Sequence, residues 1–359
     1  MRDLKDIRLE INEIDDKMRR LFEERMKAVR EVAEYKKANG LPVLDRERER
    51  ALVDSATEKL ESDELRPYYV SFLEANMAAS RRYQELLISG AKVAYSGATG
   101  AFAYIAACKL FPTATRVAYP NFEAAYAACE RGECDFAVLP IENSVGGEVG
   151  AVTDLTFSGP LKINGVTEID VSHCLLGVPG AKKEDVREVV SHPQALAQCK
   201  EYIRGSGFAE REYENTALAA EFVAKSGDKS LGAIASAEAA EIFGLEIIER
   251  SINESRTNTT RFAVFSRSEH NYGAAVGVHS ILLFTVKNEA GALAKALDVI
   301  GKHGFNMRVL RSRPMKSLMW QYYFYVEIEG NANTKEGERM VADLEAFCSQ
   351  IKIVGSYVQ

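Results

Sequence analysis

A heptad pattern near the N-terminus constrains the fold of this chain more than any other feature. Apolar residues recur three and four positions apart, at Leu4, Ile7, Ile11, Ile14, Met18, Leu21, Ala28, Val32 and Tyr35. This spacing predicts one long helix with a single apolar seam. At about 1.5 Å per residue, a helix of about 35 residues is roughly 50 Å long. Two shorter helices within residues 1–90 cannot cover such a seam, so we expect a homodimer in which a second copy does.

Polar side chains interrupt the predicted helical core in two places. Arg25 occupies the one seam position that is missing from the apolar series. On a third predicted helix, residues 66–88, Asn76, Ser80 and Gln84 lie one turn apart on the inward face. An arginine on a seam can simply fix the register of a dimer. The polar stripe opposite it favours a binding site instead, although the first alternative stays open.

The charge run DRERER, residues 45–50, divides between two faces of a second predicted helix. At about 100° per residue, Asp45, Arg48 and Glu49 share a face with the apolar residues that follow. The other three residues of the run fall on the opposite side and are expected in solvent. Burial of the first three would cost on the order of several kcal/mol each unless they are paired or bind a polar ligand. The run therefore predicts half of a ligand site.

Composition excludes several classes of protein. The net charge of -7 gives no general affinity for nucleic acid. No apolar run reaches membrane length, and the first residues lack the apolar core of a signal peptide. The six cysteines and five histidines are scattered along the chain, which favours reduced thiols in a cytoplasmic protein and no metal site.

Three segments differ in pattern. Residues 1–90 are helical in composition, residues 91–268 alternate short β-branched runs with Ala-rich stretches, and residues 266–279 resemble a linker. The rest, residues 279–359, follows a βαββαβ order. Its predicted elements are strand 280–287, helix 291–304, strands 305–313 and 320–330, helix 335–347 and strand 352–358. The sequence therefore predicts a multidomain protein with an all-α domain, an α/β domain and an α+β ferredoxin-like domain.

Residues 1–90 resemble the all-helical chorismate mutase domain. The family pattern is matched at Arg8, Arg25, Lys36, Asp45, Arg48, Glu49, Ser80 and Gln84. The resemblance implies that Arg25, Arg48 and a partner chain's copy of position 8 hold the substrate carboxylates, for which bidentate arginine is suited. It assigns Lys36 and Gln84 to the ether oxygen and the two acidic residues to the ring hydroxyl.

The chemistry of that reaction fits these residue types. Chorismate rearranges to prephenate by a pericyclic shift, which needs no acid, base or nucleophile. The enzyme must hold the reactive conformer and stabilise negative charge on the breaking ether oxygen. By analogy with oxyanion holes, each donor to that oxygen contributes about 3–4 kcal/mol.

In residues 91–268, several predicted strands end in polar turns that lead into helices. The strand ends include Glu142-Asn143-Ser144 and Ser191-His192, with Pro193 suited to a first helical turn. Strand ends that meet helix starts form anion-binding crevices. We expect Ser191 to cap its helix and Gln198 to share its face. Singly, each such Ser or Asn is more often a cap or turn residue.

The motifs PIENS, SHPQALAQC and TTRF resemble the prephenate dehydratase domain over residues 92–268. The resemblance implies two α/β lobes similar to periplasmic-binding-protein architecture, a site in the cleft, and no cofactor. It assigns Thr260 to the leaving hydroxyl. Other matched cleft positions are Glu142, Asn143, Ser144, Ser191, Gln198 and Arg261. Ala103 replaces a hydroxyl residue of the family's Gly-rich loop, so no role is carried to it, and Phe262 is expected in the core.

The C-terminal segment resembles an ACT domain, which in dehydratases binds phenylalanine at a subunit interface. One of its two motifs is intact as Gly291-Ala292-Leu293. The second reads Arg311-Ser312-Arg313-Pro314, with arginine where the family has glutamate. We expect phenylalanine to be an inhibitory effector. A ferredoxin-like module that only dimerises remains an alternative.

Together the three resemblances imply a cytoplasmic bifunctional enzyme that converts chorismate to prephenate and then to phenylpyruvate. The sequence leaves open whether the assembly is a homodimer or a homotetramer. Two alternatives remain: a dehydratase whose helical domain only dimerises, and a non-catalytic sensor of aromatic metabolites.

Overall fold

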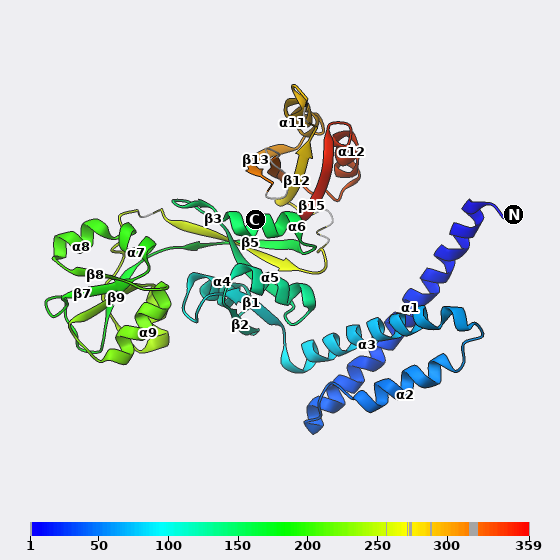
Figure 1. Ribbon diagram of the computed structural model, residues 1–359, viewed down its shortest axis with the longest axis horizontal. Helices are drawn as coiled ribbons and strands as arrows, with labels where there is room; N and C mark the ends of the chain where they lie inside the picture. The colour runs from blue at the N-terminus through cyan, green and yellow to red at the C-terminus, as the bar shows by residue number, and fades with distance from the viewer. Residues whose placement is uncertain are drawn as a thin grey trace. The chain divides into compact units, whose positions relative to one another are not determined.

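The computed structural model describes residues 2–255, 257–270, 272, 275–287, 289–315 and 322–358. The chain forms two compact units, Met1–Ala91 and Lys92–Gln359 (Figure 1). Within the described residues, no helix is long and apolar enough to cross a membrane, and no group of three or more His, Cys, Asp or Glu side chains could hold a metal ion.

The first unit consists of helices. Helix α1 spans Leu4–Asn39, α2 Arg46–Thr57 and α3 Arg66–Ser89, with a short 3-10 turn at Asp63–Leu65. Asp3 caps the start of α1 by accepting from the Lys5 amide. Gly40, with a φ of 63°, ends α1 in the left-handed conformation that favours glycine. The predicted helical segment is therefore confirmed.

The core of this unit is small and leaves the seam of α1 uncovered. Val29 and Ala33 of α1 are buried, as are Leu73 and Met77 of α3. Most of the N-terminal seam is open to solvent, and Leu21, for example, is 64% exposed. One chain thus cannot bury the apolar stripe that the heptad pattern predicts.

The described strands of the second unit form two sheets. The larger, ten-stranded sheet has the order β13-β14-β12-β15-β5-β11-β3-β1-β2, with β4 paired to β3. Its first part comprises β1 Lys92–Ser96, β2 Thr115–Tyr119, β3 Phe136–Asn143, β4 Gly147–Glu148, β5 Lys162–Asp170 and β11 Thr259–Ser266. Helices α4 Phe102–Leu110, α5 Phe122–Arg131 and α6 Gly150–Ser158 accompany these strands.

The five-stranded sheet belongs to a second α/β lobe, with the order β10-β6-β9-β7-β8. Its strands are β6 Cys174–Gly177, β7 Glu188–Ser191, β8 Ala209–Glu212, β9 Leu231–Ala235 and β10 Glu246–Glu249. Its helices are α7 Pro193–Gln198, α8 Lys200–Ser206, α9 Thr216–Ser226 and α10 Ala237–Phe243. The chain crosses between the lobes after β5 and again before β11, so each lobe has its own sheet and buried core.

The C-terminal segment has the predicted βαββαβ order. Its elements are β12 Val278–Val286, α11 Ala292–Lys302, β13 Asn306–Pro314, β14 Tyr322–Glu329, α12 Lys335–Leu344 and β15 Cys348–Val358. Trp320 and Gln321, predicted at the start of the third strand, lie outside the described residues.

This segment is joined to the first lobe through its last strand. Gly355 of β15 pairs in parallel with Ile163 of β5. A Cβ atom at position 355 would overlap the Ile163 backbone, so this close approach requires glycine. The sheet is therefore continuous from the C-terminal segment into the lobe, a union that the sequence pattern did not predict.

Candidate functional site

In the helical unit, the structure brings together Arg25 of α1 and Ser80 of α3. The Arg25 guanidinium donates to the Ser80 hydroxyl. Ser80 in turn donates to the Asn76 carbonyl over 2.8 Å. The seam arginine and the polar stripe thus face each other, as the sequence predicts.

Two polar side chains beside this pair have unmet hydrogen-bonding capacity. Gln84 is 7% exposed and its Oε1 atom is buried without a partner among the described residues. The Oδ1 atom of Asn76 is likewise buried and has no hydrogen-bond partner among the described residues. A buried polar atom without a partner costs about 1–3 kcal/mol. These two amides are therefore suited to a polar ligand.

The side chains of Lys36 and Glu49 each contact one other residue of the helical unit. The Lys36 ammonium donates to the Val43 carbonyl over 2.6 Å. Glu49 is half-buried and lies 2.5 Å from Arg81 in an ion pair. Sequence reasoning missed Arg81, although its place next to Ser80 and opposite an acidic helix face was a usable signal.

The predicted burial of Asp45 and Arg48 is wrong for the single chain, where both are exposed. Asp45 is the N-cap of α2, and its carboxylate accepts from the Arg48 amide over 3.0 Å. The helical angle identifies a face but does not show what covers it. Arg8 is also exposed on α1, and among the described residues no hydrogen bond or ion pair joins it to the Arg25 and Ser80 pair.

The second unit contains a cavity of about 720 Å³ with walls from both lobes. Residues from the first turns of α4, α5 and α9 reach it, namely Phe102, Phe122 and Thr216. The backbone amides at helix starts attract anions. Among the described residues the lining includes Glu148 and Glu214 but no lysine or arginine. An anion in this cavity would therefore be held by amides and hydroxyls.

Thr260 and Asn143 lie side by side in this cavity wall. The Asn143 side-chain amide donates to the Thr260 hydroxyl oxygen over 2.9 Å and to Asn258 over 2.7 Å. The side-chain oxygen of Asn143, Oδ1, accepts from the backbone amides of Val145 and Gly146. Because the Thr260 oxygen accepts from Asn143, its own proton is free to be donated elsewhere.

Gln198 extends this hydrogen-bonded set. Its Oε1 atom accepts from Asn258 over 3.1 Å and lies 2.9 Å from His173 Nε2, which then carries the proton. Burial lowers the pKa of His173, so the neutral ring is favoured. Sequence reasoning missed this histidine; its place between the predicted strands of the two lobes was the available signal.

Ser191 lies outside the cavity, and the prediction that it caps a helix is wrong. Ser191 is the last residue of β7, is fully buried, and donates to the Ile234 carbonyl over 2.6 Å. His192 is the N-cap of α7 instead, and its ring accepts from the Gln194 amide. The helix starts at Pro193, so the cap falls one residue later than predicted.

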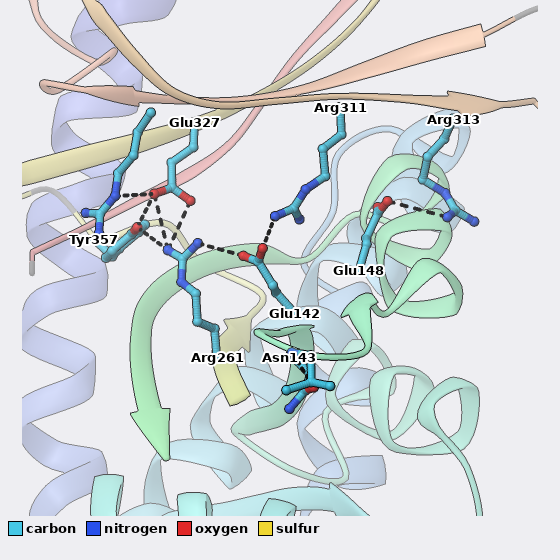
Figure 2. Close-up of polar contacts among 10 residues, drawn as sticks. Glu142, Asn143, Glu148, Arg261, Arg311, Arg313, Glu327 and Tyr357 are labelled. Atoms are coloured by element: carbon cyan, nitrogen blue, oxygen red, sulfur yellow. Dashed lines mark hydrogen bonds and ion pairs between the residues drawn. The ribbon is translucent and has the colours of Figure 1, made fainter. Parts of the chain in front are cut away.

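Glu142, Ser144 and Arg261 are also absent from the described cavity lining. Ser144 joins the backbone of residues 257 and 259, donating to one carbonyl and accepting from one amide, both over 2.9 Å. Glu142 and Arg261 pair with each other over 3.2 Å (Figure 2). Successive residues of a strand point to opposite faces, so the neighbours of Asn143 and Thr260 point away from the cavity.

The two C-terminal motifs differ in their surroundings. Gly291, at a φ of 79°, precedes α11, Ala292 is buried and Leu293 is half-buried. On β13, Ser312 and Pro314 are exposed, whereas Arg311 and Arg313 are half-buried. Both arginines pair with acidic residues of the first lobe.

Two family models match the chain in the same order as the two units. Chorismate mutase type II matches residues 7–85, and prephenate dehydratase matches residues 93–270. A bifunctional chorismate mutase/prephenate dehydratase from Aquifex aeolicus is 31% identical over 99% of this chain and 98% of its own length. The chain belongs to this bifunctional family. It is therefore an enzyme of phenylalanine biosynthesis with a mutase unit and a dehydratase domain.

Other relatives cover about three quarters of the chain. Arogenate dehydratase/prephenate dehydratase 1 from Arabidopsis thaliana is 36% identical over 75% of this chain and 72% of its own length. The solved structure of GqqA, described as a novel type of quorum quenching acylase, is 35% identical with a TM-score of 0.69, over 74% of this chain and 97% of its own. A prephenate dehydratase from Arthrobacter aurescens in complex with L-Phe is 24% identical with a TM-score of 0.68, over 75% of this chain and 90% of its own, and shows the same fold.

Proposed function

We propose that the helical unit rearranges chorismate at the site of Arg25, Ser80 and Gln84. The observation that supports this site is the pair of buried amide oxygens without partners beside the Arg25 and Ser80 contact. The two amide oxygens can accept from a hydroxyl group of the substrate. Arg25 holds a substrate carboxylate, and the Lys36 ammonium and the amide N–H of Gln84 donate to the ether oxygen as negative charge develops there. Arg48, Asp45 and Glu49 complete the site from α2.

A second copy of the chain completes this site. The exposed seam of α1 supports a dimer through that helix, since a single chain leaves Leu21 and Tyr35 more than half exposed. Arg8 lies on the same helix and would reach the partner's site as a carboxylate ligand. A homodimer satisfies this arrangement, and a homotetramer built from two such dimers remains the alternative.

In the cavity of the second unit, prephenate loses carbon dioxide and water in one step. The bond from the ring carbon to its carboxylate breaks, and that electron pair enters the ring as it becomes aromatic. The ring C–O bond breaks with it, and the departing oxygen takes the Thr260 proton to leave as water. Solvent then restores the Thr260 proton.

The hydrogen bond from Asn143 to Thr260 supports this role for the hydroxyl, because it leaves the Thr260 proton available. Gln198 sets the positions of Asn258 and His173 around the same pair. The substrate carboxylates meet the starts of α4, α5 and α9. Glu142, Ser144, Ser191 and Arg261 support the site from behind its wall rather than by contact with substrate.

Arogenate is a second candidate substrate for this cavity. Arogenate carries an ammonium group where prephenate carries a ketone oxygen. The Glu148 carboxylate lines the cavity, and its Oε1 atom is buried without a hydrogen-bond partner among the described residues, which would suit an ammonium group. Parallel assays with the two substrates distinguish them, and equal or greater kcat/KM for arogenate would establish the second activity.

We also propose that the C-terminal segment is an ACT domain that binds phenylalanine and inhibits the dehydratase. The βαββαβ order and the intact Gly291-Ala292-Leu293 support this assignment, as does the L-Phe complex of the structural relative. A module that only dimerises is the alternative. The three domain boundaries and the cytoplasmic location remain predictions from the sequence.

One assay tests the whole proposal. The full chain is supplied with chorismate, and chorismate loss and phenylpyruvate formation are followed with and without phenylalanine. The proposal requires both reactions and a fall in phenylpyruvate formation as phenylalanine rises. A flat response up to millimolar phenylalanine would remove the regulatory part alone.

A further inference from the structure

Arg311 marks the one position where the second C-terminal motif departs from its family, and its side chain faces the dehydratase lobe. The guanidinium forms an ion pair with the Glu142 carboxylate. It also lies 5.8 Å from the centre of the Tyr325 ring. Its side chain is 24% exposed, so the pair is largely shielded from water. A glutamate at this position would place two carboxylates against each other.

Glu142 connects Arg311 to a buried ionic cluster (Figure 2). Arg261 contacts Glu142 at 3.2 Å, Glu327 at 3.1 Å and the Tyr357 hydroxyl at 2.7 Å. The Glu327 side chain is fully buried. We define Glu142, Arg261, Arg311, Glu327 and Tyr357 as the junction cluster, because they join the C-terminal segment to the first lobe. Three of its members come from the C-terminal segment and two from the dehydratase lobe.

The junction cluster lies directly behind the proposed catalytic pair. In the ladder between β3 and β11, Thr260 is opposite Asn143 and Arg261 is opposite Glu142. Each proposed catalytic residue is thus covalently next to a cluster residue. A shift of Glu142 or Arg261 moves the backbone that carries Asn143 or Thr260, and their 2.9 Å hydrogen bond with it.

Arg313 provides a second anchor for the same segment. Its guanidinium pairs with Asp154 at 3.2 Å and with Glu148 at 3.6 Å. Glu148 lines the cavity together with Asn143, Gly146, Gly147 and Val149, so the wall segment lies between Glu142 and Asp154. The two arginines of β13 therefore hold both ends of one wall segment.

We propose that Arg311 is a positioning residue of the dehydratase, which acts through Glu142 to hold Asn143 and Thr260 in their catalytic arrangement. This inference rests on the proposed roles of Asn143 and Thr260. It assigns the departure from the family motif to the dehydratase reaction itself, rather than to contact with phenylalanine. A displacement of about 1 Å at a reacting group can cost about 100-fold in rate, so loss of one anchor is expected to lower kcat measurably.

The test compares Arg311→Met, Glu142→Gln and the double variant in the full chain, without phenylalanine. Arg311→Met is expected to lower the dehydratase kcat about 10-fold with KM changed less than about 2-fold, because it displaces a catalytic group and leaves the substrate carboxylate sites in place. The double variant is expected to match Glu142→Gln alone, since the two side chains act through one contact. Mutase activity is expected to be unchanged.

Three controls separate positioning from other causes. Arg339→Met, on the exposed face of α12, should keep the native kcat. Arg311→Lys retains the charge and should restore most of the rate. The melting temperature of every variant identifies a loss of fold. Only variants with the melting temperature of the native protein enter the comparison. If Arg311→Met melts at a lower temperature, Arg311→Gln replaces it.

A native kcat in folded Arg311→Met would overturn the inference. So would a double variant whose loss equals the product of the two single losses. A parallel titration of the same variants with phenylalanine shows the other cause: a native rate without phenylalanine and a weaker response to it would overturn the inference and make Arg311 an effector ligand. If the proposed catalytic roles of Asn143 and Thr260 are wrong, the result differs: Thr260→Ala keeps native dehydratase activity.

Discussion

The Asn143 side chain donates a hydrogen bond to Thr260 Oγ1 over 2.9 Å, across two paired strands. Asn143 is itself fixed by Asn258 and by two backbone amides. The Thr260 hydroxyl oxygen therefore has a fixed direction and a proton available for the cavity. The proposed dehydration depends on this relationship.

Replacement of Thr260 by alanine should remove the proton donor of the dehydratase. We expect kcat for phenylpyruvate formation to fall by about 10²–10⁴-fold, the usual contribution of a general acid. Thr260→Ser should retain much of the rate, because the hydroxyl remains. Rapid kinetics with prephenate measure both. Equal loss of mutase and dehydratase activity would indicate misfolding instead.

Replacement of Arg25 by alanine should disable the mutase. The charge that holds a substrate carboxylate would be lost, and we expect chorismate consumption to fall by several orders of magnitude. Arg30→Ala on the same helix is the matched control, since Arg30 is exposed and contacts Tyr83. Native chorismate consumption in Arg25→Ala would show that the mutase site lies elsewhere.

If Arg8 serves the site of the partner chain, two inactive variants should complement each other. Co-expressed Arg8→Ala and Arg25→Ala chains form mixed dimers in which one site carries both changes and the other carries neither. About a quarter of all sites should then be native, because half of randomly paired dimers are mixed. Mutase activity that stays at the level of the separate variants would place Arg8 in its own chain's site.

Glu327 should be important for the stability of the second unit. Its side chain is fully buried against Arg261 and Tyr357. Removal of one partner of a buried ion pair typically costs about 3–5 kcal/mol. Urea unfolding of Glu327→Ala should show a loss of this order, and Glu329→Ala, an exposed residue of the same strand, should show little. Equal stability of the two variants would contradict the description of the cluster.

His303 should make the C-terminal segment more stable at low pH. Its ring bonds to Asp343 at 2.9 Å and Glu336 at 2.6 Å, and these carboxylates raise the pKa of His303 above its ordinary value of 6.5. The stabilisation is fully present below pH 6.5 and is lost as the pH rises through the higher pKa of the folded state. Melting temperature against pH should show this for the native chain and not for His303→Gln. Parallel curves for the two proteins would refute it.

Sequence patterns predicted the helical segment, an α/β segment and the C-terminal element order, because local periodicity determines them. The division of the α/β segment into two lobes followed only from the family resemblance. The patterns also predicted that Ser80 and Gln84 face inward. They were wrong about the burial of Asp45 and Arg48, because a helical angle does not specify what covers a face. They misplaced the helix cap by one residue at Ser191. The direction of Arg261 depends on strand register, and the partners of His173 and Arg81 come from distant segments, so no local pattern identifies these contacts.

The most direct test follows chorismate and its products in the full native chain, Arg25→Ala and Thr260→Ala. We predict that the native chain converts chorismate to phenylpyruvate and that Thr260→Ala accumulates prephenate. Arg25→Ala should leave chorismate unchanged yet convert added prephenate at the native rate. Loss of both reactions in either folded variant would contradict the assignment of one reaction to each unit.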